Sequence, residues 1–225
     1  MAEPALQAPP PFDAANVRGL VFDLDGTLVD SYDAIAASLN HARESFGLSV
    51  LPPPLIRRTV GRGLERLVAD LLGEERVEEG VRHFREHYAR TFREATRPLP
   101  GALAALRELH RRGYRMTVAS NKPARFGEPI LADAGMLPYL LGVQGPDRAG
   151  STKPEPTMLR ACLDEMSLPA EQALYVGDMV LDVETAARAG LAVVLVEGGS
   201  STPEALRGTG QRVVPELGAL ADLLP

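Results

Sequence analysis

The sequence predicts an α/β fold in which a parallel sheet is interrupted by a helical insertion. From residue 98 onward, apolar segments typical of buried strands alternate with amphipathic helical segments, which indicates a parallel sheet covered on both faces. One similar strand, residues 18–23, stands alone near the beginning of the chain, and only helical patterns occupy residues 31–97. A chain of 225 residues, 45% of them hydrophobic, is long and apolar enough to bury the hydrophobic core of such a fold.

The insertion is predicted to be entirely helical. Apolar residues recur with a helical period in three segments, and the first of them ends at Gly47. The prolines of "LPPPL", residues 51–55, predict a break, and "RPLPG", residues 97–101, predicts the end of the insertion. The predicted helices span residues 31–47, 63–72 and 77–94.

The remaining elements complete the α/β pattern and define the predicted domains. We expect a flexible tail over residues 1–16, an α/β core over 17–30 and 98–225, and a helical cap domain over 31–97. The two predicted connections lie near 27–33 and 95–100. The further strands are predicted at 114–119, 141–144, 172–176, 191–196 and 212–214, and the further helices at 101–112, 124–134, 155–166, 179–189 and 216–224.

Composition narrows the functional classes. The net charge of −6 argues against a nucleic-acid binder, which usually presents a basic patch. No apolar stretch approaches the ~18–20 residues of a transmembrane helix, and the N-terminus lacks the pattern of a signal peptide. The single cysteine, Cys162, excludes an internal disulfide and fits a reducing, cytoplasmic protein, which we expect to be a monomer or homodimer.

Polar side chains follow several predicted strands at their carboxyl ends, where open α/β sheets bind ligands. Four such clusters are found: Asp23 with Asp25, Ser120 with Asn121, the segment that holds Lys153, and Asp178 with Asp182. Carboxylates brought this close together repel one another and raise some of their pKa values. A hard divalent cation with oxygen ligands removes that conflict, so the clusters predict a Mg²⁺ site.

The same edge of the sheet also carries groups suited to a phosphoryl group in transfer, which needs Mg²⁺ on one side and hydrogen-bond donors on the other. Lys153 supplies a charge and Ser120 a hydroxyl, and the backbone N–H groups of residues 24, 25 and 121 extend the predicted cradle. Only two of the 24 basic residues are lysines, Lys122 and Lys153. Without a Ser-His-Asp or Cys-His pairing or a Walker loop, a carboxylate is the expected nucleophile.

Four segments, "DLDGTLVDS", "SNKP", "KPEP" and "GDMVLD", resemble in this order the four motifs of the haloacid dehalogenase superfamily of phosphohydrolases. The resemblance covers nearly the whole chain from residue 17, and "TVGRGLERLV" and "LYVGDMVLDVETAARAG" are similar to phosphoglycolate phosphatases. It implies a Rossmann-like parallel sheet with an inserted all-helical cap. It also implies a Mg²⁺-dependent phosphatase for a small phosphorylated metabolite, with 2-phosphoglycolate the leading candidate.

The resemblance implies roles residue by residue. Asp23 attacks phosphorus, Asp25 acts as acid and then base, Thr27 helps to hold Asp25, and Lys153 steadies Asp23 and the phosphate. Ser120 and Asn121 bind phosphoryl oxygens. Asp23, the backbone carbonyl of Asp25 and Asp178 bind the metal, with Asp182 nearby. The resemblance implies no role for Lys122 or Arg62. Lys122 is expected to be either a substrate contact or a solvent-exposed residue at a helix start. Arg62 is a cap residue that could face an anionic substrate.

Several alternatives remain open from the sequence. Ser120 could cap a helix, and Asp178 or Asp182 could cap the helix that follows them. Within the same fold, a phosphomutase of the β-phosphoglucomutase type or a pyrophosphatase would use the same motifs. A non-catalytic binding protein would be favoured by the loss of a motif acid, but every motif acid is present.

Overall fold

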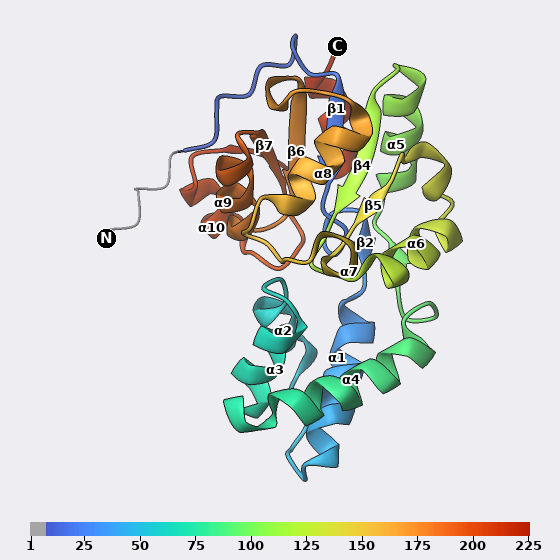
Figure 1. Cartoon of the computed structure of the whole chain (residues 1–225), viewed down its shortest axis with the longest axis vertical. Helices are drawn as coiled ribbons and strands as arrows, with labels where there is room; N and C mark the ends of the chain where they lie inside the picture. Colours follow the sequence, from blue (N-terminus) through green and yellow to red (C-terminus); the bar gives the residue numbers. More distant parts are fainter. Residues whose placement is uncertain (1–7) are drawn as a thin grey trace.

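The computed structural model describes residues 8–225, in which six parallel strands form one sheet (Figure 1). The strand order is β5-β4-β1-β6-β7-β8, so the first strand lies at the centre, between β4 and β6. The predicted α/β fold with a parallel sheet is therefore confirmed. The strands are β1 Gly19–Phe22, β4 Arg115–Ala119, β5 Val143–Gln144, β6 Ala173–Gly177, β7 Ala192–Val196 and β8 Arg212–Val214.

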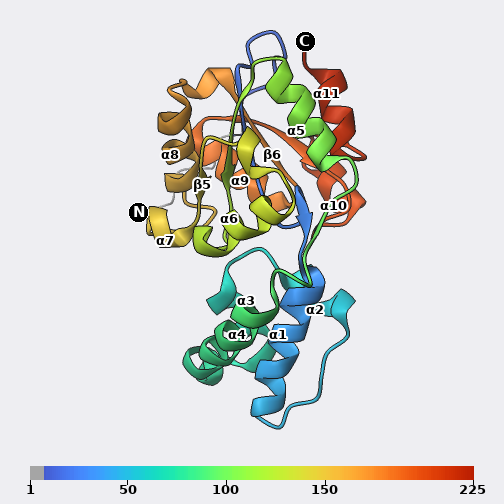
Figure 2. The same cartoon turned by 90° about the vertical axis from the view of Figure 1, so that its right-hand side faces the viewer.

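Helices cover both faces of the sheet (Figure 2). Because successive strand residues point to opposite faces, Val21 packs toward α8, α9 and α10, while Leu20 and Phe22 pack toward α5, α6 and α11. Both sides of the central strand are thus buried, as expected for a parallel sheet. The helices of this part are α5 Ala102–Arg111, α6 Ala124–Asp133, α7 Pro146–Ala149, α8 Thr157–Met166, α9 Val180–Ala189, α10 Pro203–Gly208 and α11 Leu220–Leu223.

Four helices between the first two strands of the sheet form a separate group, here called the helical unit, below the sheet in Figure 1. Two short antiparallel strands, β2 Val29–Asp30 and β3 Arg97–Pro98, connect this unit to the sheet. Both connections therefore run side by side. The helices are α1 Tyr32–Ser45, α2 Pro53–Thr59, α3 Leu64–Leu72 and α4 Val77–Thr91.

Several elements differ from the sequence prediction. Residues 51–55 were expected to be a break, but α2 begins at Pro53, because proline is compatible with the first turn of a helix, where its missing N–H has no partner to lose. The strands β2 and β3 are each two residues long, too short for a periodic pattern. The short helices α7 and α10 were missed for the same reason.

Two further points concern the N-terminal residues and whether any helix could span a membrane. Residues 1–7 of the expected tail lie outside the described residues, while residues 8–16 contain no helix or strand, and Phe12 and Ala14 pack partly against the core. Among residues 8–225, no helix is both long enough and apolar enough to cross a membrane.

Candidate active site

Three buried carboxylates meet at the carboxyl edge of the sheet. Asp23 directly follows β1, and its N–H donates to the Val176 carbonyl at 2.8 Å, which continues the pairing of β1 with β6. Asp178 directly follows β6, and Asp182 lies in the first turn of α9. One oxygen from each carboxylate lies within 4.8 Å of the others, so the predicted convergence is found.

A single lysine ammonium lies among these carboxylates. Lys153 Nζ is 2.7 Å from Asp23 Oδ2 and 2.8 Å from Asp182 Oδ1, and all three side chains are buried. The Tyr175 hydroxyl accepts from Lys153 Nζ at 3.0 Å and donates to Asp182 Oδ1 at 2.8 Å. Tyr175 is not among the residues predicted from the sequence, although a phenol within a fully buried strand needs a hydrogen-bond partner.

The charges of this group do not balance. Burial raises the pKa of Asp23 to about 6, an effect that Lys153 opposes and Asp182 reinforces. Burial, followed by repulsion from Asp23 and Asp182, also raises the pKa of Asp178 well above its usual range. For Lys153, burial lowers the pKa, but Asp182 and Asp23 outweigh it and raise the pKa overall. A buried group of oxygen donors with excess negative charge fits a hard divalent cation such as Mg²⁺.

Asp178 is oriented by two donors from different segments. The Thr27 hydroxyl donates to Asp178 Oδ1 at 3.2 Å, and the Ser200 N–H donates to Oδ2 at 2.7 Å. A Cβ atom at Gly199 would lie 1.8 Å from Asp178 Oδ2, so this close approach requires glycine. The resemblance implies that Thr27 helps to hold Asp25, whereas in the structure its hydroxyl donates to Asp178.

Asp182 also caps a helix, because its Oδ2 accepts the Met179 N–H at the beginning of α9 at 2.9 Å. Asp182 therefore has two roles: it caps α9, as one alternative from the sequence proposed, and it contacts Lys153. Asp178 has no such role in α9 among the described residues, and its carboxylate is held by Thr27 and Ser200 instead.

Asp25 lies apart from the three carboxylates and has its own cation. Lys122 Nζ is 3.1 Å from Asp25 Oδ1, and the Ser31 hydroxyl donates to the same oxygen. Lys122 is only 9% exposed, so the alternative of a solvent-exposed lysine is wrong. Ser31 was not predicted as a site residue, although it lies in the motif "DLDGTLVDS" just before α1.

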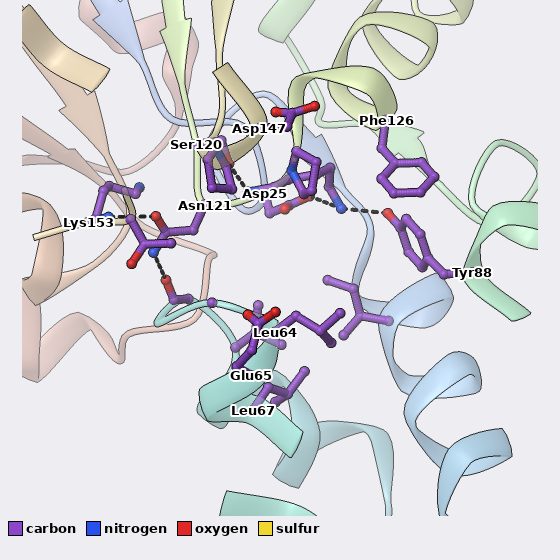
Figure 3. Close-up of a pocket in the computed structure, with 18 of the residues that line it drawn as sticks. Asp25, Leu64, Glu65, Leu67, Tyr88, Ser120, Asn121, Phe126, Asp147 and Lys153 are labelled. Atoms are coloured by element: carbon purple, nitrogen blue, oxygen red, sulfur yellow. Dashed lines mark hydrogen bonds and ion pairs between the residues drawn. The ribbon is translucent and has the colours of Figure 1, made fainter. Parts of the chain in front are cut away.

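Ser120 and Asn121 follow β4, as predicted. The Ser120 hydroxyl accepts the Lys122 N–H at 3.3 Å, while α6 begins only after Pro123, so Ser120 is not the cap of α6. Asn121 Oδ1 accepts the Lys153 N–H at 2.7 Å, and its Nδ2 donates to the Gly61 carbonyl at 2.7 Å (Figure 3). Asn121 thus joins the lysine-bearing loop to the helical unit.

These groups surround a cavity of about 360 Å³ between the sheet edge and the helical unit (Figure 3). The sheet edge provides Asp23, Asp25, the two lysines, Ser120 and Asn121, whereas Asp178 and Asp182 are fully buried behind them and do not line the cavity. Arg62 is exposed and does not line the cavity, but Arg85 and Arg125 do. The helical unit contributes mainly apolar and aromatic side chains: Ile35, Val60, Leu64, Leu67, Phe84 and Tyr88.

Comparison with known proteins identifies similar chains over most of this length. The sequence model of the haloacid dehalogenase-like hydrolase family matches residues 20–196. The phosphoglycolate phosphatase of Rhodospirillum rubrum is 35% identical over 215 residues, which are 91% of this chain and 86% of that protein. The phosphoglycolate phosphatase of Cereibacter sphaeroides is 37% identical over 80% of this chain and 85% of its own.

Solved structures show the same fold. A haloacid dehalogenase-like family hydrolase from Streptococcus pneumoniae aligns with a TM-score of 0.84 and 21% identity, over 92% of this chain and 98% of that one. A structure from Bacteroides fragilis aligns with a TM-score of 0.86 and 25% identity, over 91% and 99% of the two chains. The resemblance drawn from the four motifs and the predicted class of enzyme, a phosphoric monoester hydrolase, are confirmed by these comparisons.

Proposed function

Because this chain belongs to the haloacid dehalogenase-like hydrolase family, we propose that it hydrolyses a small phosphate monoester through an aspartyl-phosphate on Asp23. One observation carries the proposal. Asp23 is held by Lys153 within the group of three carboxylates, while Asp25, two residues later, is held separately by Lys122 and Ser31. Two carboxyl groups in different surroundings can serve as nucleophile and as acid and base in the same reaction.

In the first step, a carboxylate oxygen of Asp23 attacks phosphorus, and the bond from phosphorus to the ester oxygen breaks. Lys153 Nζ and the Leu24 N–H, 2.7 Å from Asp23 Oδ2 and Oδ1 respectively, orient the nucleophile. Asp25 donates its proton to the leaving oxygen. In the second step, Asp25 takes a proton from water, which attacks phosphorus and releases phosphate and free Asp23.

We propose that Asp23, Asp178 and the backbone carbonyl of Asp25 hold Mg²⁺, with Asp182 nearby. The metal, when bound, neutralises charge on the carboxylates and on the phosphoryl oxygens. The three buried carboxylates face one lysine ammonium, and this excess of negative charge supports the assignment. Ser120 and the N–H groups after β1 and β4 are proposed to bind the remaining phosphoryl oxygens.

We propose that residues 31–97 act as a cap that closes over the substrate and excludes water. Two observations support this role: the helical unit lines the cavity, and both of its connections pass through the paired strands β2 and β3. The proposed substrate is 2-phosphoglycolate, because relatives with 34–37% identity carry the name phosphoglycolate phosphatase.

Phosphate release from a panel of phosphorylated compounds tests the proposal. The panel contains 2-phosphoglycolate, glucose phosphates and pyrophosphate, each measured with MgCl₂ and with EDTA, and Asp23→Asn is the inactive control. We expect Mg²⁺-dependent release that is fastest from 2-phosphoglycolate. Isomerisation of a glucose phosphate without phosphate release would indicate a mutase, and preference for pyrophosphate a pyrophosphatase. Failure on every ester would contradict the proposed function.

A further inference from the structure

Tyr88 lies where the helical unit meets the sheet edge. It belongs to α4, is 3% exposed, and lines the cavity together with Asp25 and Lys122 (Figure 3). Its hydroxyl lies 2.5 Å from Lys122 Nζ, which donates to it. Tyr88 is thus a side chain of the helical unit that is hydrogen-bonded to a charged group of the sheet edge.

An aromatic cluster fixes the orientation of the Tyr88 ring. The ring stacks on Phe84 and Phe92 of the helical unit, with centroid distances of 5.4 and 5.6 Å. It also meets Phe126 of α6 edge to face at 5.3 Å. Aromatic pairs at such distances favour defined geometries, so the ring is held between both parts of the molecule with its hydroxyl directed at Lys122.

Lys122 carries this contact on to Asp25. Its Nζ lies 3.1 Å from Asp25 Oδ1 and 4.8 Å from the centre of the Tyr88 ring, so the ammonium is held between the two side chains. A lysine ammonium on a flexible four-carbon stem is poorly fixed by a single partner. The Tyr88 hydroxyl and ring therefore define where the positive charge stands relative to Asp25.

The two carboxylate oxygens of Asp25 differ in their contacts. Both Lys122 and Ser31 bind Oδ1, whereas no residue within 8–225 makes a hydrogen bond or ion pair to Oδ2. A carboxyl group with one oxygen anchored presents the other to a reacting group in a defined direction. The carboxyl of Asp25 can therefore exchange a proton through Oδ2 while Oδ1 stays in place.

We infer that Tyr88 is a positioning residue that acts through Lys122: its hydroxyl fixes the ammonium against Asp25 Oδ1 and thereby directs Oδ2 to the leaving oxygen. Since Tyr88 belongs to the helical unit, Asp25 is fully positioned only when that unit sits on the sheet edge. The inference rests on the proposed function, in which Asp25 protonates the leaving group. It assigns proton transfer, rather than attack on phosphorus, as the step that depends on Tyr88.

The test is Tyr88→Phe, which removes the hydroxyl and keeps the ring in its aromatic cluster. Kinetics are measured on an alkyl phosphate, 2-phosphoglycolate, and on 4-nitrophenyl phosphate, whose leaving group needs little protonation. We expect kcat/KM for the alkyl ester to fall about tenfold, a fraction of the ~10²–10⁴ of general acid–base catalysis, and that for the aryl ester to change about twofold or less. Tyr114→Phe is the matched control, because this buried tyrosine donates to the Pro225 carbonyl outside the cavity.

A double-mutant cycle separates positioning from direct substrate contact, since Tyr88 also lines the cavity. Lys122→Met removes the ammonium. If Tyr88 acts through Lys122, the loss on the alkyl ester in the double variant equals that in Lys122→Met alone. If Tyr88 binds the substrate directly, the two losses multiply, and the inference is overturned. Thermal melting of each variant establishes that it is folded.

The outcomes also separate this inference from the proposed function. A wild-type protein that hydrolyses neither ester contradicts the proposed function itself. A wild-type protein that hydrolyses both, with Tyr88→Phe equally active on the alkyl ester, contradicts only the role of Tyr88. Equal losses on the alkyl and aryl esters likewise overturn it, because attack on phosphorus, and not proton transfer, would then depend on Tyr88.

Discussion

The sheet edge and the helical unit bound the same cavity with different kinds of contact. At the sheet edge, Asp23 and Asp178 directly follow paired strands, so the backbone ladder sets their positions. The helical unit instead reaches the sheet edge through individual groups, such as the Tyr88 hydroxyl, the Arg57 guanidinium and the Gly61 carbonyl. We therefore propose that the chemistry depends on the sheet edge, while closure and substrate selection depend on contacts of the helical unit that can be removed one at a time.

The largest expected effect is at the sheet edge, with Asp23→Asn. Loss of the nucleophile should reduce kcat by at least about 10⁴-fold, as removal of the nucleophile does in other enzymes with covalent intermediates. The fold should persist, and the melting temperature in EDTA should rise, because the cost of burying this ionised carboxylate, which Asp182 increases, is gone. Phosphate release and thermal melting measure both effects. Retention of appreciable activity would contradict the assignment of the nucleophile.

Asp25→Asn is expected to have the next largest effect. Asparagine keeps the shape and can still accept from Lys122 and Ser31, but it cannot transfer a proton. We expect kcat on 2-phosphoglycolate to fall by ~10²–10⁴, the usual contribution of general acid–base catalysis. Phosphoenzyme formation from 4-nitrophenyl phosphate should be much less affected, which rapid-quench measurement can show. Equal loss on both esters would place Asp25 in a different role.

The charge imbalance at the sheet edge predicts a pH-dependent effect of Mg²⁺. In the metal-free folded protein the pKa of Asp23 is about 6, above its ordinary value of 3.8, so the folded state binds more protons than the unfolded chain between these values. The stability that this carboxyl contributes is complete below about pH 4 and is lost as pH rises through about 6. The raised pKa of Asp178 acts in the same direction.

We therefore expect the melting temperature in EDTA to decrease as pH rises from 4 to 7, and the increase caused by MgCl₂ to be larger at pH 7 than at pH 5. Asp178→Asn is the matched variant, because it removes a proposed ligand and one repelling charge together. It should flatten the pH dependence in EDTA and weaken the response to Mg²⁺. A response to Mg²⁺ that is the same at both pH values would contradict the metal assignment.

The same contrast explains what could be predicted from the sequence. Asp23 and Asp178 were predictable together because both directly follow parallel strands, whose ends meet at one edge whatever the details of packing. Ser31 and Tyr88 were not, because their contacts to Asp25 and Lys122 depend on how the helical unit is seated. The resemblance implies that Thr27 helps to hold Asp25, but its hydroxyl donates to Asp178, because a match to a motif does not fix which nearby acid a short side chain reaches.

The smallest expected effect is at Arg57 of the helical unit, for which Arg62 is a matched control. Arg57 lies over the Tyr32 ring at 4.2 Å and donates to the Gly198 and Gly199 carbonyls of the loop that follows β7, whereas Arg62 is exposed. The two hydrogen bonds together contribute about 1–3 kcal/mol, so Arg57→Met should favour the open position and raise KM by about fivefold or more.

Because the carboxylates of the sheet edge keep their own backbone supports, kcat at saturating substrate and the effect of Mg²⁺ on melting should be little changed in Arg57→Met. Arg62→Met should leave KM unaltered, in contrast to the sequence-based expectation that Arg62 faces the substrate. Steady-state kinetics on 2-phosphoglycolate measure both variants. A fall in kcat for Arg57→Met, with KM constant, would mean that the loop beyond β7 needs the helical unit to hold Asp178 through Ser200, and that the two regions are not separable.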